Sequence, residues 1–171
     1  MSTNARIGMT TDAVGSAVRS IYTHWDGYPT HHGRILFEHY TSADAVRDLL
    51  DLGDLSSLGY TLGEKHDFDA HRGEETCNAY GRDREETDVA ARTHDPLSWP
   101  DSGQEYEYLF TLTDGWQYRN TWPEPGPWKT LDLAAVISEL RAEQLHLKSL
   151  GYETADLDAQ ITRLTHDRAM A

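Results

Sequence analysis

One short stretch of this chain predicts a β-hairpin, and that prediction constrains the fold more than any other feature. Residues 105–112 (Glu-Tyr-Glu-Tyr-Leu-Phe-Thr-Leu) alternate with a period of two, as a strand with one buried face does. Asp114-Gly115 follows as a strong signal for a two-residue turn, and Trp116 and Tyr118 begin the return strand. A wholly helical fold is therefore excluded.

The N-terminal part of the chain predicts a second hairpin. Residues 6–9 and 18–25 alternate well enough for two strands, and residues 12–15 (Asp-Ala-Val-Gly) provide the turn between them. Two hairpins can align in one sheet, so we expect an antiparallel sheet built from both of them.

Helical periodicity follows these strands. Beyond residues 27–29 (Gly-Tyr-Pro), apolar and aromatic side chains recur at the spacing of one helix face: Ile35, Leu36, His39 and Tyr40. Thr41 and Asp44 resemble a capping box for a second short helix, which would end at Gly53. We expect helices over about residues 32–52 to cover one face of the sheet.

The rest of the chain divides into a polar segment, a stiff connector and two helices. Residues 64–95 hold 10 acidic and 5 basic side chains with little apolar periodicity, which predicts a long loop. Residues 122–128 (Trp-Pro-Glu-Pro-Gly-Pro-Trp) suit neither a helix nor a central strand. Apolar stripes at 133–147 and 157–164 predict a C-terminal helical hairpin. The expected fold is one α+β domain over residues 1–171, with the sheet and its helices in 1–128 and the helical hairpin in 129–171.

Length and charge narrow the function classes. At roughly 100–200 residues per domain, 171 residues form one domain. The 29 acidic and 15 basic side chains give a formal net charge of −14, which disfavours nucleic acid or anionic membranes as partners and favours basic ones. Cys77 has no cysteine to pair with, and neither a signal peptide nor a membrane span is evident. We therefore expect a cytoplasmic protein, with homo-oligomers left open.

Histidine and aspartate gather in two segments that can supply nitrogen and oxygen ligands to Zn²⁺, Mn²⁺ or Fe²⁺. The candidate metal ligands are His24, Asp26, His66, Asp67 and Asp69, with His71 nearby. The adjacent His31 and His32 are expected to point in different directions. The alternative interpretation is that His24 bonds to a strand neighbour, that residues 26–29 form a turn, and that the His66 segment is a solvated loop.

A pair of arginines provides the other candidate site. In residues 80–86 (Tyr-Gly-Arg-Asp-Arg-Glu-Glu), Arg82 and Arg84 would point to one side of an extended segment and hold an anionic small ligand such as a nucleotide. The alternative is that both pair with the acidic neighbours Asp83, Glu85, Glu86 and Asp88. The full set of candidate ligand-binding residues is His24, Trp25, Asp26, Tyr28, Tyr80, Arg82 and Arg84.

Four segments, taken together, resemble a family of small uncharacterised proteins encoded by bacteriophages and prophages. They are Ser20–Pro29 (SIYTHWDGYP), Leu52–Gly59 (LGDLSSLG), His66–Asp69 (HDFD) and Ala79–Arg84 (AYGRDR). The resemblance runs from about Arg6 to Trp116 and does not cover the closing helical hairpin. In that family, cysteine often stands at the position of Thr23. The resemblance implies a phage setting and supplies no catalytic residue.

These observations lead to two functional expectations. No complete catalytic motif is present, and Ser56-Ser57 is interpreted as a turn or helix cap rather than a nucleophile elbow. We therefore expect a non-enzymatic inhibitor of a host defence factor, located in the cytoplasm of the host cell and needing no cofactor. It would either block a groove by mimicking nucleic acid or sequester a small nucleotide signal. The alternative is a metal-dependent phosphoester hydrolase that uses the histidine–aspartate cluster and a divalent metal.

Overall fold

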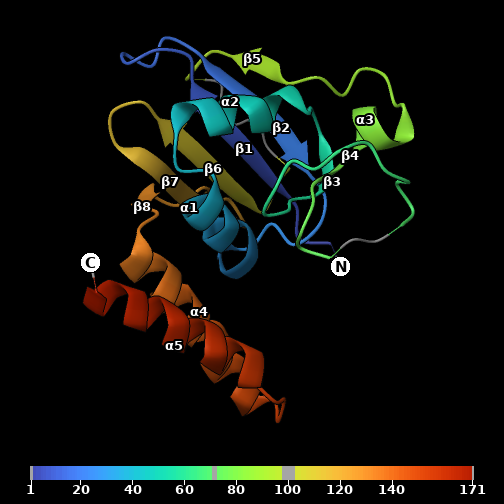
Figure 1. The fold of residues 1–171 in the computed structure, drawn as a ribbon. Coiled ribbons are helices and arrows are strands. Elements are labelled where there is room, and N and C mark those ends of the chain that lie inside the picture. The colour runs from blue at the N-terminus through green and yellow to red at the C-terminus, as the bar shows by residue number, and fades with distance from the viewer. Residues whose placement is uncertain (1, 71–72, 98–102, 171) are drawn as a thin grey trace.

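The computed structural model describes residues 2–70, 73–97 and 103–170, which form one sheet with helices on one face (Figure 1). The strands are β1 (Ala5–Thr10), β2 (Val18–Thr23), β3 (Leu55–Ser57), β4 (Asn78–Ala79), β5 (Arg92–His94), β6 (Tyr106–Thr111), β7 (Gly115–Asn120) and β8 (Lys129–Thr130). Along the main path of the described sheet the order is β4-β3-β2-β1-β6-β7-β8, and β5 pairs with β2. The expected α+β class is confirmed.

Both predicted hairpins are present. Strands β1 and β2 pair antiparallel with Ile7 opposite Ile21, and β6 and β7 pair with Tyr108 opposite Tyr118. The two-residue turn predicted at Asp114-Gly115 is wrong by one position. The loop has three residues, 112–114, and Gly115 already pairs with Thr111 in the ladder. Gly115 takes a positive φ of 74°, as the bulge that closes a three-residue hairpin loop requires.

Among the described strands the sheet is mostly antiparallel, as predicted, but it also contains two parallel pairs that the sequence did not predict. Strands β1 and β6 run parallel with Ile7 beside Tyr108, and β2 runs parallel to β3 with Thr23 beside Leu55. The helices between β2 and β3 form the crossover that a parallel pair needs, because a tight turn cannot join parallel strands. The candidate site lies where β2 and β3 both reach their carboxyl-terminal ends.

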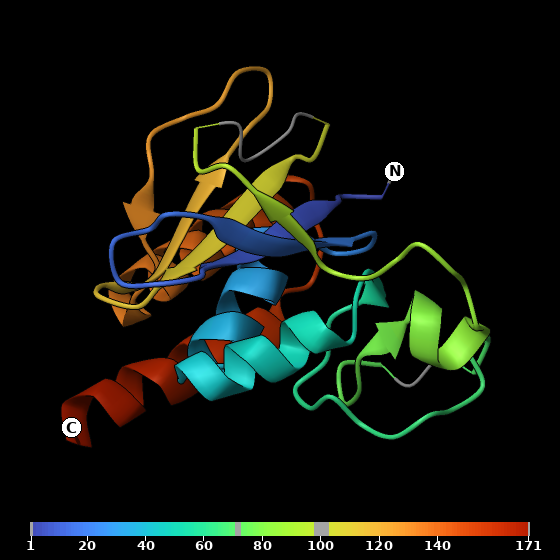
Figure 2. The ribbon, with the colours of Figure 1, turned by 90° about the horizontal axis from the view of Figure 1, so that it is seen from above.

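The helices between these strands cover one face of the sheet, as Figure 2 shows from above. They are the π-helical turn η1 (Pro29–Gly33), α1 (Arg34–His39) and α2 (Ala43–Asp51). The predicted capping box at Thr41 is wrong by one residue. Ser42 is the N-cap, and its hydroxyl accepts a hydrogen bond from the backbone N–H of Ala45 at 3.2 Å.

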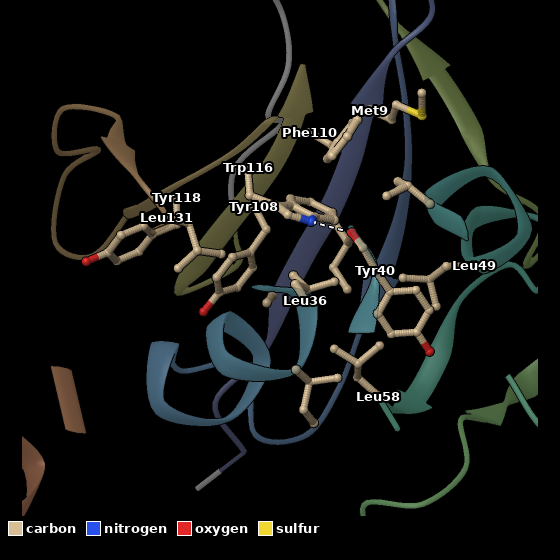
Figure 3. Packing of buried hydrophobic residues seen from close by; sticks show 14 of the residues in the cluster. Met9, Leu36, Tyr40, Leu49, Leu58, Tyr108, Phe110, Trp116, Tyr118 and Leu131 are labelled. Carbon is tan, nitrogen blue, oxygen red and sulfur yellow. Dashed lines mark hydrogen bonds between the residues drawn. The ribbon is translucent and has the colours of Figure 1, made fainter. Parts of the chain in front are cut away.

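The core lies between this helical layer and the sheet (Figure 3). Leu36 and Leu49 from the helices are fully buried, as are Ile7 and Tyr108 from the sheet. Trp116 is only 5% exposed, and its indole N–H donates to the backbone carbonyl of Tyr40 at 2.8 Å. The core therefore joins the second hairpin to the end of α1.

The polar segment 64–95 is more ordered than the predicted loop. Its described part contains β4 and β5, which pair with β3 and β2 in the sheet, and the short helix α3 (Tyr80–Arg84), which lies to one side of the sheet (Figures 1 and 2). The Asp83 carboxylate accepts from the backbone N–H of Ala79 at 2.8 Å and so holds the start of this helix. Side-chain bonds of this kind leave no periodic signal in a sequence.

The predicted C-terminal helical hairpin is present as α4 (Leu133–Ser149) and α5 (Ala155–Met170). Val136 and Leu140 of α4 are fully buried, while the turn of the hairpin extends away from the sheet (Figure 1). Among the described residues, no helix has both the length and the apolar character needed to cross a membrane.

Gly53 and Gly115 have nearly the same positive φ but differ in whether an added Cβ would clash with a neighbour. Gly53 and Gly115 have φ values of 75° and 74°. A Cβ at Gly53 would lie 2.4 Å from the Val89 carbonyl oxygen, whereas a Cβ at Gly115 would meet nothing within 4 Å. We expect Gly115→Ala to lower the free energy of unfolding by about 1 kcal/mol and Gly53→Ala by clearly more, measured by urea denaturation. Equal losses would contradict the close packing at Gly53.

Candidate binding pocket

A pocket of about 450 Å³ opens where β2 and β3 end side by side. Because the two strands are parallel, their carboxyl ends meet at one edge, which is where open sheets with parallel strands commonly bind ligands. The backbone pairing with β3 continues past the end of β2: His24 N–H donates to the Leu55 carbonyl at 3.1 Å, and Trp25 N–H to the Ser56 carbonyl at 3.0 Å. Trp25 and Ser56 both line the pocket.

Trp25 and Asp26 line the pocket immediately after β2. Asp26 has a positive φ of 58°, a conformation that aspartate tolerates better than most residues, and the chain turns sharply there. Gly27 allows the turn, because a Cβ at that position would lie 2.7 Å from the Ala5 Cβ. This turn leaves the Trp25 side chain 46% exposed.

Neighbouring side chains hold these two residues. The Tyr28 hydroxyl donates to the Asp26 carboxylate at 3.3 Å. Burial, together with the charge of Asp26, raises the pKa of Tyr28 to about 12, so this hydroxyl keeps its proton near neutral pH. The His24 ring stands edge-on to the Trp25 indole at 4.7 Å, and its Nδ1 lies 2.8 Å from the Tyr22 hydroxyl. His24 is thus bonded to a strand neighbour, as the alternative interpretation held.

Another wall of the pocket comes from the loop that contains His66, Phe68 and Asp69. The Asn78 amide donates to the Phe68 carbonyl at 3.0 Å, and the His66 N–H donates to the Asp83 carboxylate at 3.2 Å. The buried Asn78 Oδ1 has no hydrogen-bond partner among the described residues. An unpaired buried oxygen costs about 1–3 kcal/mol, which marks this wall as a place for a donor.

Asp83 and Arg82 anchor the loop that contains His66 and Phe68. The Asp83 carboxylate is fully buried and receives hydrogen bonds from Arg82 at 2.8 Å through both of its oxygens. Arg82 also donates to the carbonyls of Leu62 at 2.6 Å and Cys77 at 2.6 Å. The Arg82 and Ala79 donors hold the pKa of Asp83 below its usual value against the effect of burial, which acts the other way.

Arg82 and Arg84 are therefore not placed to hold one anionic ligand together, although the sequence predicted this. Residues 80–84 form a helix, and side chains two positions apart on a helix do not face the same side. Arg82 is engaged within the protein, while the exposed Arg84 lies 5.2 Å from the Phe68 ring and 3.3 Å from the Glu86 carboxylate. The alternative of pairing with acidic neighbours is confirmed for both arginines. Tyr80 packs against the Phe68 ring at 5.4 Å and supports the pocket wall.

The five candidate metal ligands are only partly brought together. Asp26, His66 and Asp69 line the pocket, but His24 bonds to Tyr22 and Asp67 accepts from the Asp69 N–H at 3.1 Å. In residues 2–70, 73–97 and 103–170, no three His, Cys, Asp or Glu side chains are placed to hold a metal ion. His71 lies outside the described residues.

A buried hydrogen-bonded chain leads from the pocket into the core. His31 lines the pocket, and its Nε2 faces the Glu74 carboxylate at 3.5 Å. The Nδ1 atoms of His31 and His32 are 3.1 Å apart, and the His32 Nε2 is 2.6 Å from the Thr23 hydroxyl. The prediction that the two rings point apart is wrong, because η1 turns both inward, with His32 fully buried.

The Glu74 carboxylate at one end of this hydrogen-bonded series limits which histidine nitrogen can carry a proton. The Glu74 carboxylate accepts only, so its contact at 3.5 Å favours a proton on His31 Nε2, while the donor in the His31–His32 and His32–Thr23 bonds depends on the tautomer of each ring. Burial lowers the pKa of both histidines, that of His32 most strongly. Both rings are therefore neutral near pH 7.

Sequence reasoning identified part of this pocket. Trp25 and Asp26 were candidate binding residues, while His31, Ser56, Thr76 and Asn78 were not. Thr76 and Asn78 belong to no motif named from the sequence, and Ser56 lies in the Leu52–Gly59 segment, where it was interpreted as part of a turn or helix cap. The only sequence signal for His31 was its place in the histidine-rich segment. The chain has no significant match among protein-family models, curated proteins or solved structures.

Proposed function

We propose that the protein is a phage-encoded, non-enzymatic acidic binding protein that inhibits a host defence factor by occupying a basic groove. One observation carries the proposal: the pocket unites residues from three motifs of the phage-family resemblance, Ser20–Pro29, Leu52–Gly59 and His66–Asp69, around an exposed Trp25. Its described lining includes the carboxylates of Asp26 and Asp69 and no lysine or arginine. Such a site, in a chain of net charge −14, suits a basic partner.

Within this proposal, a basic groove is favoured over a small nucleotide. Sequestering a nucleotide would require cations for its phosphates, and the arginines named for that task serve other contacts. Arg82 is bonded to Asp83 and to backbone carbonyls, and Arg84 lies against Phe68 and Glu86. The hydrolase alternative has no described cluster of three ligands to support it. Stoichiometric metal in protein purified without chelators would favour that alternative.

Recovery of the tagged protein from infected cells, followed by mass spectrometry, tests the proposal. We expect a host protein with a basic groove to be recovered with it, and we expect its affinity to fall at least about tenfold as salt rises from about 0.1 to about 0.5 M. Binding that persists at high salt, and that charge reversal of exposed acidic residues does not weaken, would contradict occupation of a basic groove.

A further inference from the structure

Carboxylate oxygens reach the pocket from two separate segments of the chain. Asp26 follows β2, and Asp69 belongs to the loop that forms the other wall with His66 and Phe68. The Tyr28 hydroxyl uses one acceptor position of Asp26, and a carboxylate has about four such positions. Asp69 is exposed to solvent. A hydrogen-bond donor with several N–H groups can therefore find acceptors on both walls.

Aromatic faces complete the same pocket. Trp25 is 46% exposed, and the His24 ring packs against its indole in a T-shaped arrangement with the ring centroids 4.7 Å apart. Tryptophan attracts a cation placed over its face within about 6 Å more strongly than other aromatic residues do. The other aromatic ring of the pocket, Phe68, already has the guanidinium carbon of Arg84 at 5.2 Å. This loop thus accommodates a guanidinium group within the protein itself.

The remaining polar groups are compatible with a cationic donor. Asn78 Oδ1 is a buried acceptor with no partner among the described residues. His31 is the histidine that connects the pocket to the core, and burial lowers its pKa, so it adds no positive charge near neutral pH. The described lining therefore combines carboxylates, an amide acceptor and aromatic faces.

We propose that this pocket binds the guanidinium group of an arginine side chain presented by the partner protein. The inference rests on the proposed function and names the group that the site recognises. A guanidinium is planar, so it can stack on the Trp25 indole while its fork of N–H groups donates to Asp26 or Asp69. A lysine ammonium is a compact, strongly hydrated charge that has neither a plane to stack on the indole nor a planar fork of N–H groups. A nucleotide phosphate would meet the two carboxylates and be repelled.

The test uses the full-length protein and three capped pentapeptides. Each has two glycines on either side of a central residue, which is arginine, lysine or citrulline. Citrulline has nearly the shape of arginine but no charge. The readout is the indole N–H resonance of Trp25, assigned with the variant Trp25→Phe. We expect the arginine peptide to shift this resonance saturably, the lysine peptide to bind at least about threefold more weakly, and the citrulline peptide to leave it unmoved.

Variants of the lining identify the acceptors. We expect Asp26→Asn, which suits the positive φ of this position, to weaken binding of the arginine peptide about tenfold, and Asp69→Asn to weaken it several-fold. Glu124→Gln is the matched control, because it removes one exposed negative charge in residues 122–128 outside the pocket. It should change the affinity by less than about twofold. Equal binding of the citrulline or lysine peptide, or an unchanged affinity in Asp26→Asn, would overturn the inference.

The peptide experiment and the recovery from infected cells fail independently. A host protein recovered with the tagged chain, without binding of the arginine peptide, would overturn the guanidinium inference and leave the proposed function standing. Binding of the peptide, without recovery of any host protein, would support the guanidinium site and contradict the proposed function.

Discussion

Replacing Asp83 with alanine is expected to lower the free energy of unfolding by about 3–5 kcal/mol. The Asp83 carboxylate is fully buried and receives hydrogen bonds from Arg82 and from the backbone N–H groups of Ala79 and His66. Its removal leaves a guanidinium that is mostly buried and two backbone donors without their acceptor. Urea denaturation at neutral pH measures the loss.

Glu86→Ala is the matched control for Asp83→Ala. Glu86 also pairs with an arginine of α3, at 3.3 Å, but both side chains of that pair are largely exposed. An exposed ion pair contributes about 0–1 kcal/mol, so this variant should remain close to the wild type. Similar losses in the two variants would show that the Arg82–Asp83 pair does not anchor the pocket loop.

Acidification is expected to destabilise the protein through His31 and His32. Their pKa values are lowered in the folded state, so below about pH 6.5 the unfolded chain binds protons that the folded chain does not. Stability is then fully present above the unfolded pKa and falls as the pH decreases. A histidine that stays neutral contributes a loss of about 2 kcal/mol between about pH 7.5 and pH 5.0. The loss is smaller for His31, because Glu74 and Asp26 oppose the effect of burial.

Carboxylates affect this titration differently. The pKa values of Asp83 and Glu74 are lowered, so the stability that these groups contribute is lost only at lower pH. Burial raises the pKa of Glu107, so protonation of this group stabilises the folded protein as the pH falls, which opposes the effect of the histidines. The unfolding experiment is therefore done in Glu107→Gln as well as in the wild type.

The nitrogen chemical shifts of the His32 ring provide the direct measurement. They should remain those of a neutral imidazole as the pH falls below 6.5, because burial lowers the pKa of His32 well below its ordinary value. Protonation of His32 near pH 6.5 in the folded protein would contradict the buried chain.

The local elements of the fold were predictable because their signals are periodic. The alternation at residues 105–112 predicted β6, and the cap signal of Thr41 and Asp44 with the stop at Gly53 predicted α2. Errors of one residue arose where neighbouring residues offer the same chemistry. Thr41 and Ser42 can both cap a helix, and Asp114-Gly115 fits a two-residue or a three-residue loop.

Pairing between distant segments was not predictable. The parallel neighbours of β1 and β2 depend on the long-range packing of helices against the sheet, which a local pattern does not encode. The interpretation of Ser56-Ser57 as a turn or helix cap is wrong, because both residues belong to β3. The short helix α3 depends on the bonds of Asp83 and not on an apolar stripe.

The candidate site was predictable only in part, for the same reason. The segments with Trp25, Asp26 and Asp69 stood out by composition, and the structure brings them to one pocket. Arg82 stood out equally, yet its hydrogen bonds to the carbonyls of Leu62 and Cys77 make it a structural residue. A charged residue can bind a ligand or bond within the protein, and for Arg82 the outcome depends on a contact with a residue 20 positions away in the sequence.

The central claim is that the pocket at the ends of β2 and β3 is where the partner binds. Quantitative recovery of the host partner from infected cells with Trp25→Ala, compared with Trp122→Ala, tests it most directly. Both variants remove an exposed indole, and Trp122 lies outside the pocket at 74% exposure. We expect Trp25→Ala to reduce recovery at least about tenfold, as loss of a central aromatic anchor does, and Trp122→Ala to leave it unchanged. Full recovery with folded Trp25→Ala protein would contradict the claim.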